Sequence, residues 1–75
     1  MARARTLRRV FAANLRRLRL FSPSMTQAEL AEAAGVTRHY VSSLESARRE
    51  PSFKMIEALS DALDVDARQF FEVMP

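Results

Sequence analysis

The chain has 75 residues, of which 48% are hydrophobic and 28% charged, and its formal net charge is +3. This length suits one small domain that needs a well-packed core. The sequence has no cysteine, one histidine and one glycine, which excludes disulfides, thiolate metal sites and glycine-rich phosphate loops and leaves almost nothing for a metal or acid–base centre.

The N-terminal part carries most of the positive charge. Residues 1–21 hold seven arginines and no acidic residue, whereas residues 22–75 hold five basic and nine acidic residues. Such a basic surface attracts phosphate, although a solvated helix face is the alternative. We expect residues 1–6 to form a flexible basic arm, in which Arg3 and Arg5 either reach DNA or stay disordered.

A first helix is predicted after the arm, with Thr6 as its cap and 7–75 forming one domain. Its inward apolar stripe consists of Leu7, Val10, Phe11, Leu15 and Leu18. No alternating run of β-branched residues occurs anywhere, and only three prolines and one glycine interrupt the chain. The sequence therefore favours an all-α fold.

The next helix is predicted to begin at Thr26, because Thr26 and Glu29 have the spacing of a capping box. Its inward positions are Ala28, Leu30, Ala31 and Ala34. Gly35 follows where the chain must turn, a position that commonly requires a positive φ. Two short helices joined by this turn form a helix-turn-helix pattern.

Thr37 is predicted to cap the third helix, with Val41 and Leu44 facing inward. The outward positions are then Arg38, His39, Tyr40, Ser42 and Ser43. This face lacks acidic residues and is rich in hydrogen-bond donors, which suits a polyanion. It indicates double-stranded DNA as the partner.

A loop with Arg48 and Arg49 leads to Ser52, which is predicted to cap a fourth helix. The inward stripe of that helix is Phe53, Ile56, Leu59, Ala62 and Leu63. Asp66 and Gln69 form a further cap pair before a short last helix with Phe70 in the core.

The C-terminal end has more apolar surface than one small domain needs, contributed by Phe71, Val73 and Met74. We expect these residues to form a homodimer interface. The alternative is that they complete the monomer core or contact a further domain.

The run TQAELAEAAGVTRHYVSSLE, the ARREPS loop, FKMIEALSDALDV and the closing DARQFF resemble the lambda and 434 repressor or Cro-like helix-turn-helix family, also called the XRE family. The resemblance covers residues 7–71. It implies a compact five-helix domain whose second and third helices form the motif, with residues 37–45 as the recognition helix. Within the family, the chain is similar to the controller proteins of restriction–modification systems.

The resemblance also implies residue roles. It assigns base reading to Arg38, His39, Ser42 and Ser43 and backbone contacts to Gln27, Thr37, Tyr40, Arg48 and Arg49. Arg19 and Glu45 match a partly buried pair that ties the first helix to the third. Ala47 occupies a position where relatives have glycine, and because alanine at positive φ stores about 1 kcal/mol, we expect this helix end to differ from the family geometry.

The sequence therefore predicts a sequence-specific DNA-binding regulator that binds a pseudo-palindromic operator as a homodimer. The alternative is a protein-interaction module, either an antitoxin or a transcriptional adaptor. We expect no catalytic activity, metal, cofactor, membrane span or small-molecule ligand. We expect a bacterial or phage protein that is cytoplasmic and associated with the nucleoid.

Overall fold

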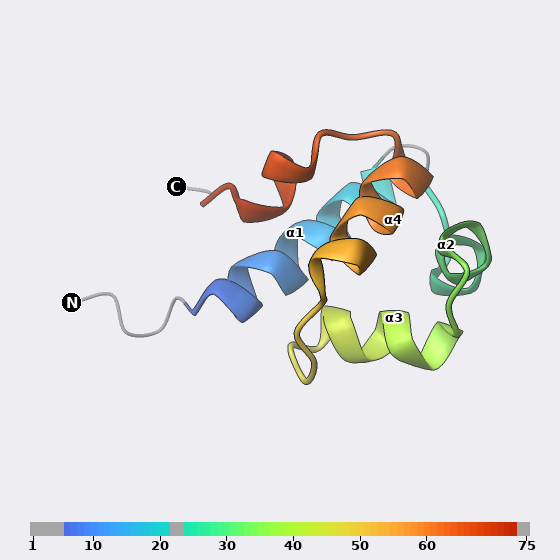
Figure 1. The fold of residues 1–75 in the computed structure, drawn as a ribbon, viewed down its shortest axis with the longest axis horizontal. Helices are drawn as coiled ribbons and strands as arrows, with labels where there is room; N and C mark the ends of the chain where they lie inside the picture. The colour runs from blue at the N-terminus through green and yellow to red at the C-terminus, as the bar shows by residue number, and fades with distance from the viewer. Residues whose placement is uncertain (1–5, 22–23, 74–75) are drawn as a thin grey trace.

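The computed structural model describes residues 6–21 and 24–73, and these residues form helices and no strand (Figure 1). The elements are α1 (Leu7–Phe21), α2 (Gln27–Ala34), α3 (Arg38–Glu45), α4 (Phe53–Leu63) and the 3-10 helix η1 (Ala67–Phe71). The all-α class is thus confirmed. The predicted fifth helix is a single short 3-10 segment, which suits five residues because an α-helical nucleus is costly at that length.

All five elements contribute to one apolar core. Its largest fully buried side chains are Phe11, Leu15, Leu30, Val41, Leu44, Leu59, Leu63 and Phe70. Phe11 and Phe70 lie with ring centroids 5.1 Å apart, which joins the first helix to the last. Each such side chain contributes about 1.5–3 kcal/mol by leaving water, so the short helices depend on this shared core.

Three residues of the predicted inward stripes face solvent instead. Leu7 is 65% exposed, Phe53 is 85% exposed, and Ala28 is also exposed. Leu7 and Phe53 are the first residues of their helices, where the stripe extends past the packed neighbours. The expectation that they belong to the core was wrong, and the two apolar side chains are left on the surface.

The predicted helix starts are confirmed. The hydroxyl of Thr26 accepts from the Glu29 N–H at 3.0 Å, and the Glu29 carboxylate accepts from the Thr26 N–H at 2.9 Å. Thr37 and Ser52 cap α3 and α4, and the Asp66 and Gln69 pair caps η1. These bonds satisfy backbone donors that a helix leaves free at its first turn.

The helix ends share one geometry. After α2, Gly35 has φ 76° and the Val36 N–H donates to the Ala31 carbonyl. After α3, Ala47 has φ 62° and the Arg48 N–H donates to the Ser43 carbonyl in the same pattern. Ala47 thus adopts the left-handed conformation, at a cost of about 1 kcal/mol. The expectation that this helix end differs from the family geometry stays a prediction.

Asn14 of α1 fixes the C-terminal segment. Its side chain is 2% exposed, and its Nδ2 donates to the carbonyl oxygens of Phe70 at 2.9 Å and Glu72 at 2.7 Å. Its Oδ1 accepts from Arg17 Nη2 at 3.1 Å. A buried amide with both ends satisfied favours one docking position for η1.

Candidate nucleic-acid interface

The turn between α2 and α3 sets the direction of the recognition helix. The left-handed conformation of Gly35 ends α2, and Thr37 starts α3 two residues later by accepting from the Tyr40 N–H at 3.0 Å. Val41 and Leu44 are fully buried and hold α3 against the core. In Figure 1, α3 consequently lies along one side of the molecule with one face toward solvent.

The outward face of α3 contains three of the four predicted base-reading residues. Arg38 and His39 are exposed and Ser42 is half-buried. Among the described residues, no acidic side chain lies within ion-pair distance of Arg38. These side chains therefore have donors available for a ligand outside the protein.

Ser43 does not belong to this face. It is 6% exposed, and its hydroxyl donates to the carbonyl of His39 at 3.0 Å. Because α3 packs through Val41 and Leu44, position 43 turns toward the domain, and the expectation that Ser43 faces outward was wrong. Ser46, one turn after Ser42, is exposed. Its spacing of four residues from Ser42 is the sequence signal that would have identified it as an outward position.

Tyr40 lies against the domain surface. Its ring is half-buried and packs on the core, and the guanidinium carbon of Arg49 lies 5.6 Å from the ring centroid. That arrangement is a cation–π contact, which restrains a long side chain at the surface. Arg48 and Arg49 are both exposed, so the loop after α3 offers two positive charges beside the outward face.

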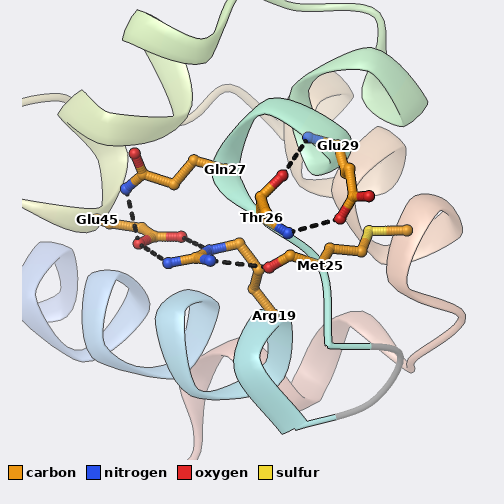
Figure 2. A network of polar contacts seen from close by, with 6 residues as sticks. All are labelled: Arg19, Met25, Thr26, Gln27, Glu29 and Glu45. Atoms are coloured by element: carbon orange, nitrogen blue, oxygen red, sulfur yellow. Dashed lines mark hydrogen bonds and ion pairs between the residues drawn. The ribbon is translucent and has the colours of Figure 1, made fainter.

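A buried polar network joins α1, α2 and α3, as Figure 2 shows. Arg19 of α1 donates through Nε to Glu45 Oε2 at 2.6 Å and through Nη2 to Glu45 Oε1 at 2.9 Å. Its Nη1 donates to the carbonyl of Met25 at 2.8 Å. The pair predicted between Arg19 and Glu45 is therefore present, in two-bond geometry.

The two charges in this network compensate each other inside the protein. The side chains of Arg19 and Glu45 are 9% and 4% exposed. The hydrogen bond that Arg19 donates to Glu45 raises the pKa of Arg19 above its ordinary value, and burial acts in the opposite direction. The charge of Glu45 at the end of the recognition helix is thus neutralised inside the protein rather than presented to a polyanion.

Gln27 belongs to the same network, which sequence reasoning missed. Its Nε2 donates to Glu45 Oε1 at 3.1 Å (Figure 2). The second N–H and the carbonyl oxygen of this amide remain available at the half-buried surface. The predicted backbone-contacting residue is therefore attached to the end of α3.

Of the predicted dimer residues, Phe71 lies beside Leu7 and Phe53, the first residues of α1 and α4. Phe71 is half-buried with its ring 5.9 Å from that of Phe11, and Val73 is 60% exposed. Met74 lies outside the described residues, as does the predicted arm with Arg3 and Arg5. A groove of about 250 Å³ passes beside Phe71 and is lined by Leu7, Arg8, Phe11, Glu50, Pro51, Phe53, Ile56 and Phe71.

Neither a metal-binding cluster nor a membrane span is found in the described part of the chain. No group of three or more histidine, cysteine, aspartate or glutamate side chains within residues 6–21 and 24–73 is placed to hold a metal ion. None of the helices described there is long and apolar enough to cross a membrane.

Comparison with known proteins identifies relatives of the same fold. The helix-turn-helix family model matches residues 15–70. The structure is similar to the restriction-modification controller protein C.AhdI from Aeromonas hydrophila, with a TM-score of 0.81 and 34% identity over 85% of this chain and 96% of that chain. Comparison with the curated proteins gives no significant match.

Two further solved structures are similar. The clp gene regulator ClgR from C. glutamicum has a TM-score of 0.81 and 33% identity, covering 88% of this chain and 84% of that chain. The hypothetical transcription factor NHTF from Neisseria has a TM-score of 0.83 and 37% identity, covering 89% and 76%. With the helix-turn-helix geometry and the matched family model, the chain belongs to the XRE-type helix-turn-helix family of DNA-binding transcriptional regulators.

Proposed function

We propose that this protein binds a pseudo-palindromic operator as a homodimer and reads its sequence in the major groove with α3. The observation that carries the proposal is the outward face of α3, where Arg38, His39 and Ser42 present donors beside a neutralised Glu45. A face of this kind is complementary to base edges, which display acceptors at guanine and adenine. Such a regulator acts in the bacterial cytoplasm at the nucleoid and needs no catalytic centre.

Base reading is assigned chiefly to Arg38. A guanidinium binds O6 and N7 of guanine with two hydrogen bonds, each good pair contributing about 1–3 kcal/mol of discrimination. His39 and Ser42 contribute single hydrogen bonds next to it. Ser43 has a positioning role, because its hydroxyl is bonded to the His39 carbonyl within α3.

Backbone contacts are assigned to both ends of the motif. Gln27 donates its second amide N–H to a phosphate, and Thr37 donates a hydroxyl whose oxygen already accepts from the Tyr40 N–H. Arg48 and Arg49 bind phosphates from the loop. Tyr40 contributes to the backbone contact through Arg49, which its ring restrains.

The homodimer is assigned to the predicted residues Phe71, Val73 and Met74 together with Leu7 and Phe53, which line one groove with Phe71. Arg8 and Glu50 border the groove with opposite charges, 3.9 Å apart. A two-fold contact places the same patch on both protomers, so opposite charges at one rim support self-association. Burial of the exposed Leu7 and Phe53 provides the driving force.

C.AhdI is a restriction-modification controller protein, and the similarity of this chain to 96% of that protein supports a controller-like role. The protein-interaction alternative, an antitoxin or an adaptor, draws support from the same apolar groove. The two functions differ in what α3 contacts. A sequence-reading regulator requires α3 to meet base edges, whereas an adaptor requires only the groove and its surroundings.

Selection of bound duplexes from a random DNA pool tests the proposal. We expect an enriched sequence with two inverted half-sites whose centres lie about one helical turn, roughly 10 base pairs, apart. The matched control is the Arg38→Ala variant, which is expected to lose enrichment at one base pair in each half-site. If the wild-type protein enriches no sequence, the regulator proposal fails and the adaptor function takes its place.

A further inference from the structure

The arginines of α1 divide into two groups by their partners. Arg8, Arg17 and Arg19 each have an acidic partner, which is Glu50, Glu72 and Glu45 respectively. Arg9 and Arg16 are exposed and have no acidic partner within ion-pair distance among the described residues. Two positive charges of α1 are therefore not compensated within the domain.

These two arginines share one face of the helix. They are seven residues apart, which is two helical turns and about 10 Å along the axis. Measured along the axis of a duplex, that distance corresponds to about three phosphates of one strand, at roughly 3.4 Å of axis per charge. The spacing is suited to a linear polyanion rather than to a single small anion.

The face lies next to the recognition helix. Arg8, Arg9, Ala12 and Ala13 of α1 line one side of an open hollow, and Glu45, Ser46 and Ala47 line the other. Its alanine and serine residues leave room for an approaching chain. Arg16 precedes Arg19 by three residues on α1, which makes the two neighbours on the helix surface. Arg19 itself belongs to the network that holds Gln27 (Figure 2).

Glu45, the acidic residue that lines the hollow, does not repel a bound anion. The carboxylate of Glu45 already accepts two hydrogen bonds from Arg19 and one from Gln27. The other charged residues that line the hollow are Arg8, which pairs with Glu50, and Arg9, which has no such partner among the described residues. The α1 face thus connects the two regions assigned to phosphate contact, Gln27 at one end and the Arg48–Arg49 loop beyond the end of α3.

We propose that Arg9 and Arg16 form a second phosphate-binding surface, which contacts the DNA backbone alongside the groove that α3 enters. This inference rests on the proposed function and adds a contact outside the helix-turn-helix itself. The surface contributes affinity without sequence preference, because it meets only phosphates. An acidic protein is the competing partner, and continuity with Gln27 and the loop arginines favours DNA.

The test measures affinity for a mixed-sequence DNA duplex of about 30 base pairs between roughly 50 and 200 mM salt. For Arg9→Gln with Arg16→Gln, we expect the slope of log K against log salt to fall by about 1.8 in magnitude, or about 0.9 for each arginine. Glutamine preserves helix propensity, so circular dichroism and the Tm should remain close to wild type. The control is Arg68→Gln, which removes one positive charge from η1, on the opposite side of the molecule from α3 in Figure 1.

A second variant pair tests the hollow without removing an arginine. Ala13 is exposed at its edge, so Ala13→Glu introduces a carboxylate and Ala13→Gln introduces a neutral side chain of the same shape. Ala13→Glu is expected to weaken DNA binding and to reduce the salt slope, whereas Ala13→Gln leaves the slope near the wild-type value.

The outcomes separate this inference from the proposed function. If the wild type binds DNA and the double variant changes the slope no more than Arg68→Gln does, the α1 surface is overturned while the regulator function stands. Equal effects of Ala13→Glu and Ala13→Gln also contradict it. If the wild type fails to bind DNA at all, both proposals fail together.

Discussion

The side-chain amide of Gln27 donates to the same carboxylate oxygen of Glu45 that accepts from Arg19 Nη2, at 3.1 and 2.9 Å. One oxygen atom thereby joins the start of α2 and the end of α3 to the first helix. A residue assigned to phosphate and the helix assigned to base reading are held in fixed relation (Figure 2). The proposed DNA contacts and the stability of the domain are consequently linked at Glu45.

The Arg19→Met variant is expected to be strongly destabilised. Removing the guanidinium leaves Glu45 buried with Gln27 as its remaining side-chain donor, and breaking a buried pair from one side costs about 3–5 kcal/mol. The raised pKa of Arg19 agrees with a pair that stabilises the charged form. Thermal unfolding monitored by circular dichroism measures the effect, and a domain of this size should lose at least about 12 °C in Tm.

The control for this pair is the double variant Arg19→Met with Glu45→Leu. Replacement of both charges by apolar groups is often close to neutral, so the double variant should recover most of the lost stability. It should still bind DNA less tightly, because Gln27 loses the acceptor that orients it. A melting temperature of Arg19→Met equal to that of wild type would contradict the assignment of the pair as structural.

Arg38→Ala and Arg48→Ala should impair DNA binding in different ways. Loss of a base contact costs about 1–3 kcal/mol and relaxes preference at one base pair, whereas loss of a phosphate contact weakens all sequences and lowers the salt slope by about one. Both side chains are exposed, so neither change should alter stability. Affinities for a set of operator variants distinguish the two, and a uniform loss for Arg38→Ala across that set would refute its base-reading role.

Local features of this fold could be predicted from the sequence because their partners are close in the chain. The capping box of Thr26 and Glu29 spans three residues, and Gly35 lies next to the helix it ends. The pair of Arg19 and Glu45 lies 26 residues apart, and only the family resemblance suggested it. Hydrophobic spacing identified most of the core for the same reason, since helical periodicity repeats every turn.

Features that depend on how one helix packs against another could not be predicted from the sequence. Leu7 and Phe53 fit their apolar stripes but lie past the packed neighbours, and Ser43 turns inward because of the direction of α3. Asn14 occupies a stripe position among apolar residues, where its spacing gives no partner. Only the docking of η1 brings the Phe70 and Glu72 carbonyls to its amide.

Phe53→Ser with Val73→Ser should impair dimer formation while leaving the monomer folded. Phe53 is 85% exposed and Val73 is 60% exposed, so neither contributes much to the core. Each phenylalanine buried between protomers contributes about 1.5–3 kcal/mol, which is roughly tenfold or more in the dissociation constant. Sedimentation velocity over a range of concentrations measures this constant. Phe21→Ser is the matched control, since Phe21 is 75% exposed and lies outside the groove; equal loss in both variants would argue against the assigned interface.

Acid should weaken the cap of η1 through Asp66. The side-chain hydrogen bond from Arg68 lowers the pKa of Asp66, and the Arg68 backbone N–H adds to this effect. Because the folded pKa lies below the unfolded value of about 3.9, the charge stabilises the fold above that pH and this contribution is lost as pH falls through the folded pKa. The contribution is small, since both side chains are exposed.

Asp66→Asn keeps an oxygen acceptor for the cap but removes the charge. Its urea midpoint should therefore lie below that of wild type at pH 7, and the difference should narrow below about pH 4. Asp61→Asn is the control, an exposed carboxylate of α4 that forms no ion pair with any described residue. A constant difference between Asp66→Asn and wild type across this pH range would be inconsistent with the linkage.

Ala47→Gly should stabilise the protein, although it removes a side chain. Ala47 has φ 62°, a conformation that costs an alanine about 1 kcal/mol and a glycine almost nothing. The greater freedom of glycine in the unfolded chain offsets part of the gain, so we expect a net stabilisation of about 0.5 kcal/mol. Urea unfolding with an unchanged m-value is the measurement.

Two variants show whether backbone conformation is the cause. Gly35→Ala introduces the same strain at φ 76°, and apart from its chain neighbours no atom lies within 4 Å of the added Cβ. Its expected net loss of about 0.5 kcal/mol, the reverse of the gain at position 47, therefore arises from the backbone alone. Ala33→Gly, on the exposed face of α2, should lose about 1 kcal/mol because its φ is helical. If only Ala47→Gly stabilises the protein, the recognition helix is followed by a strained residue whose strain a glycine relieves. If Ala47→Gly destabilises the protein, this alanine carries no strain.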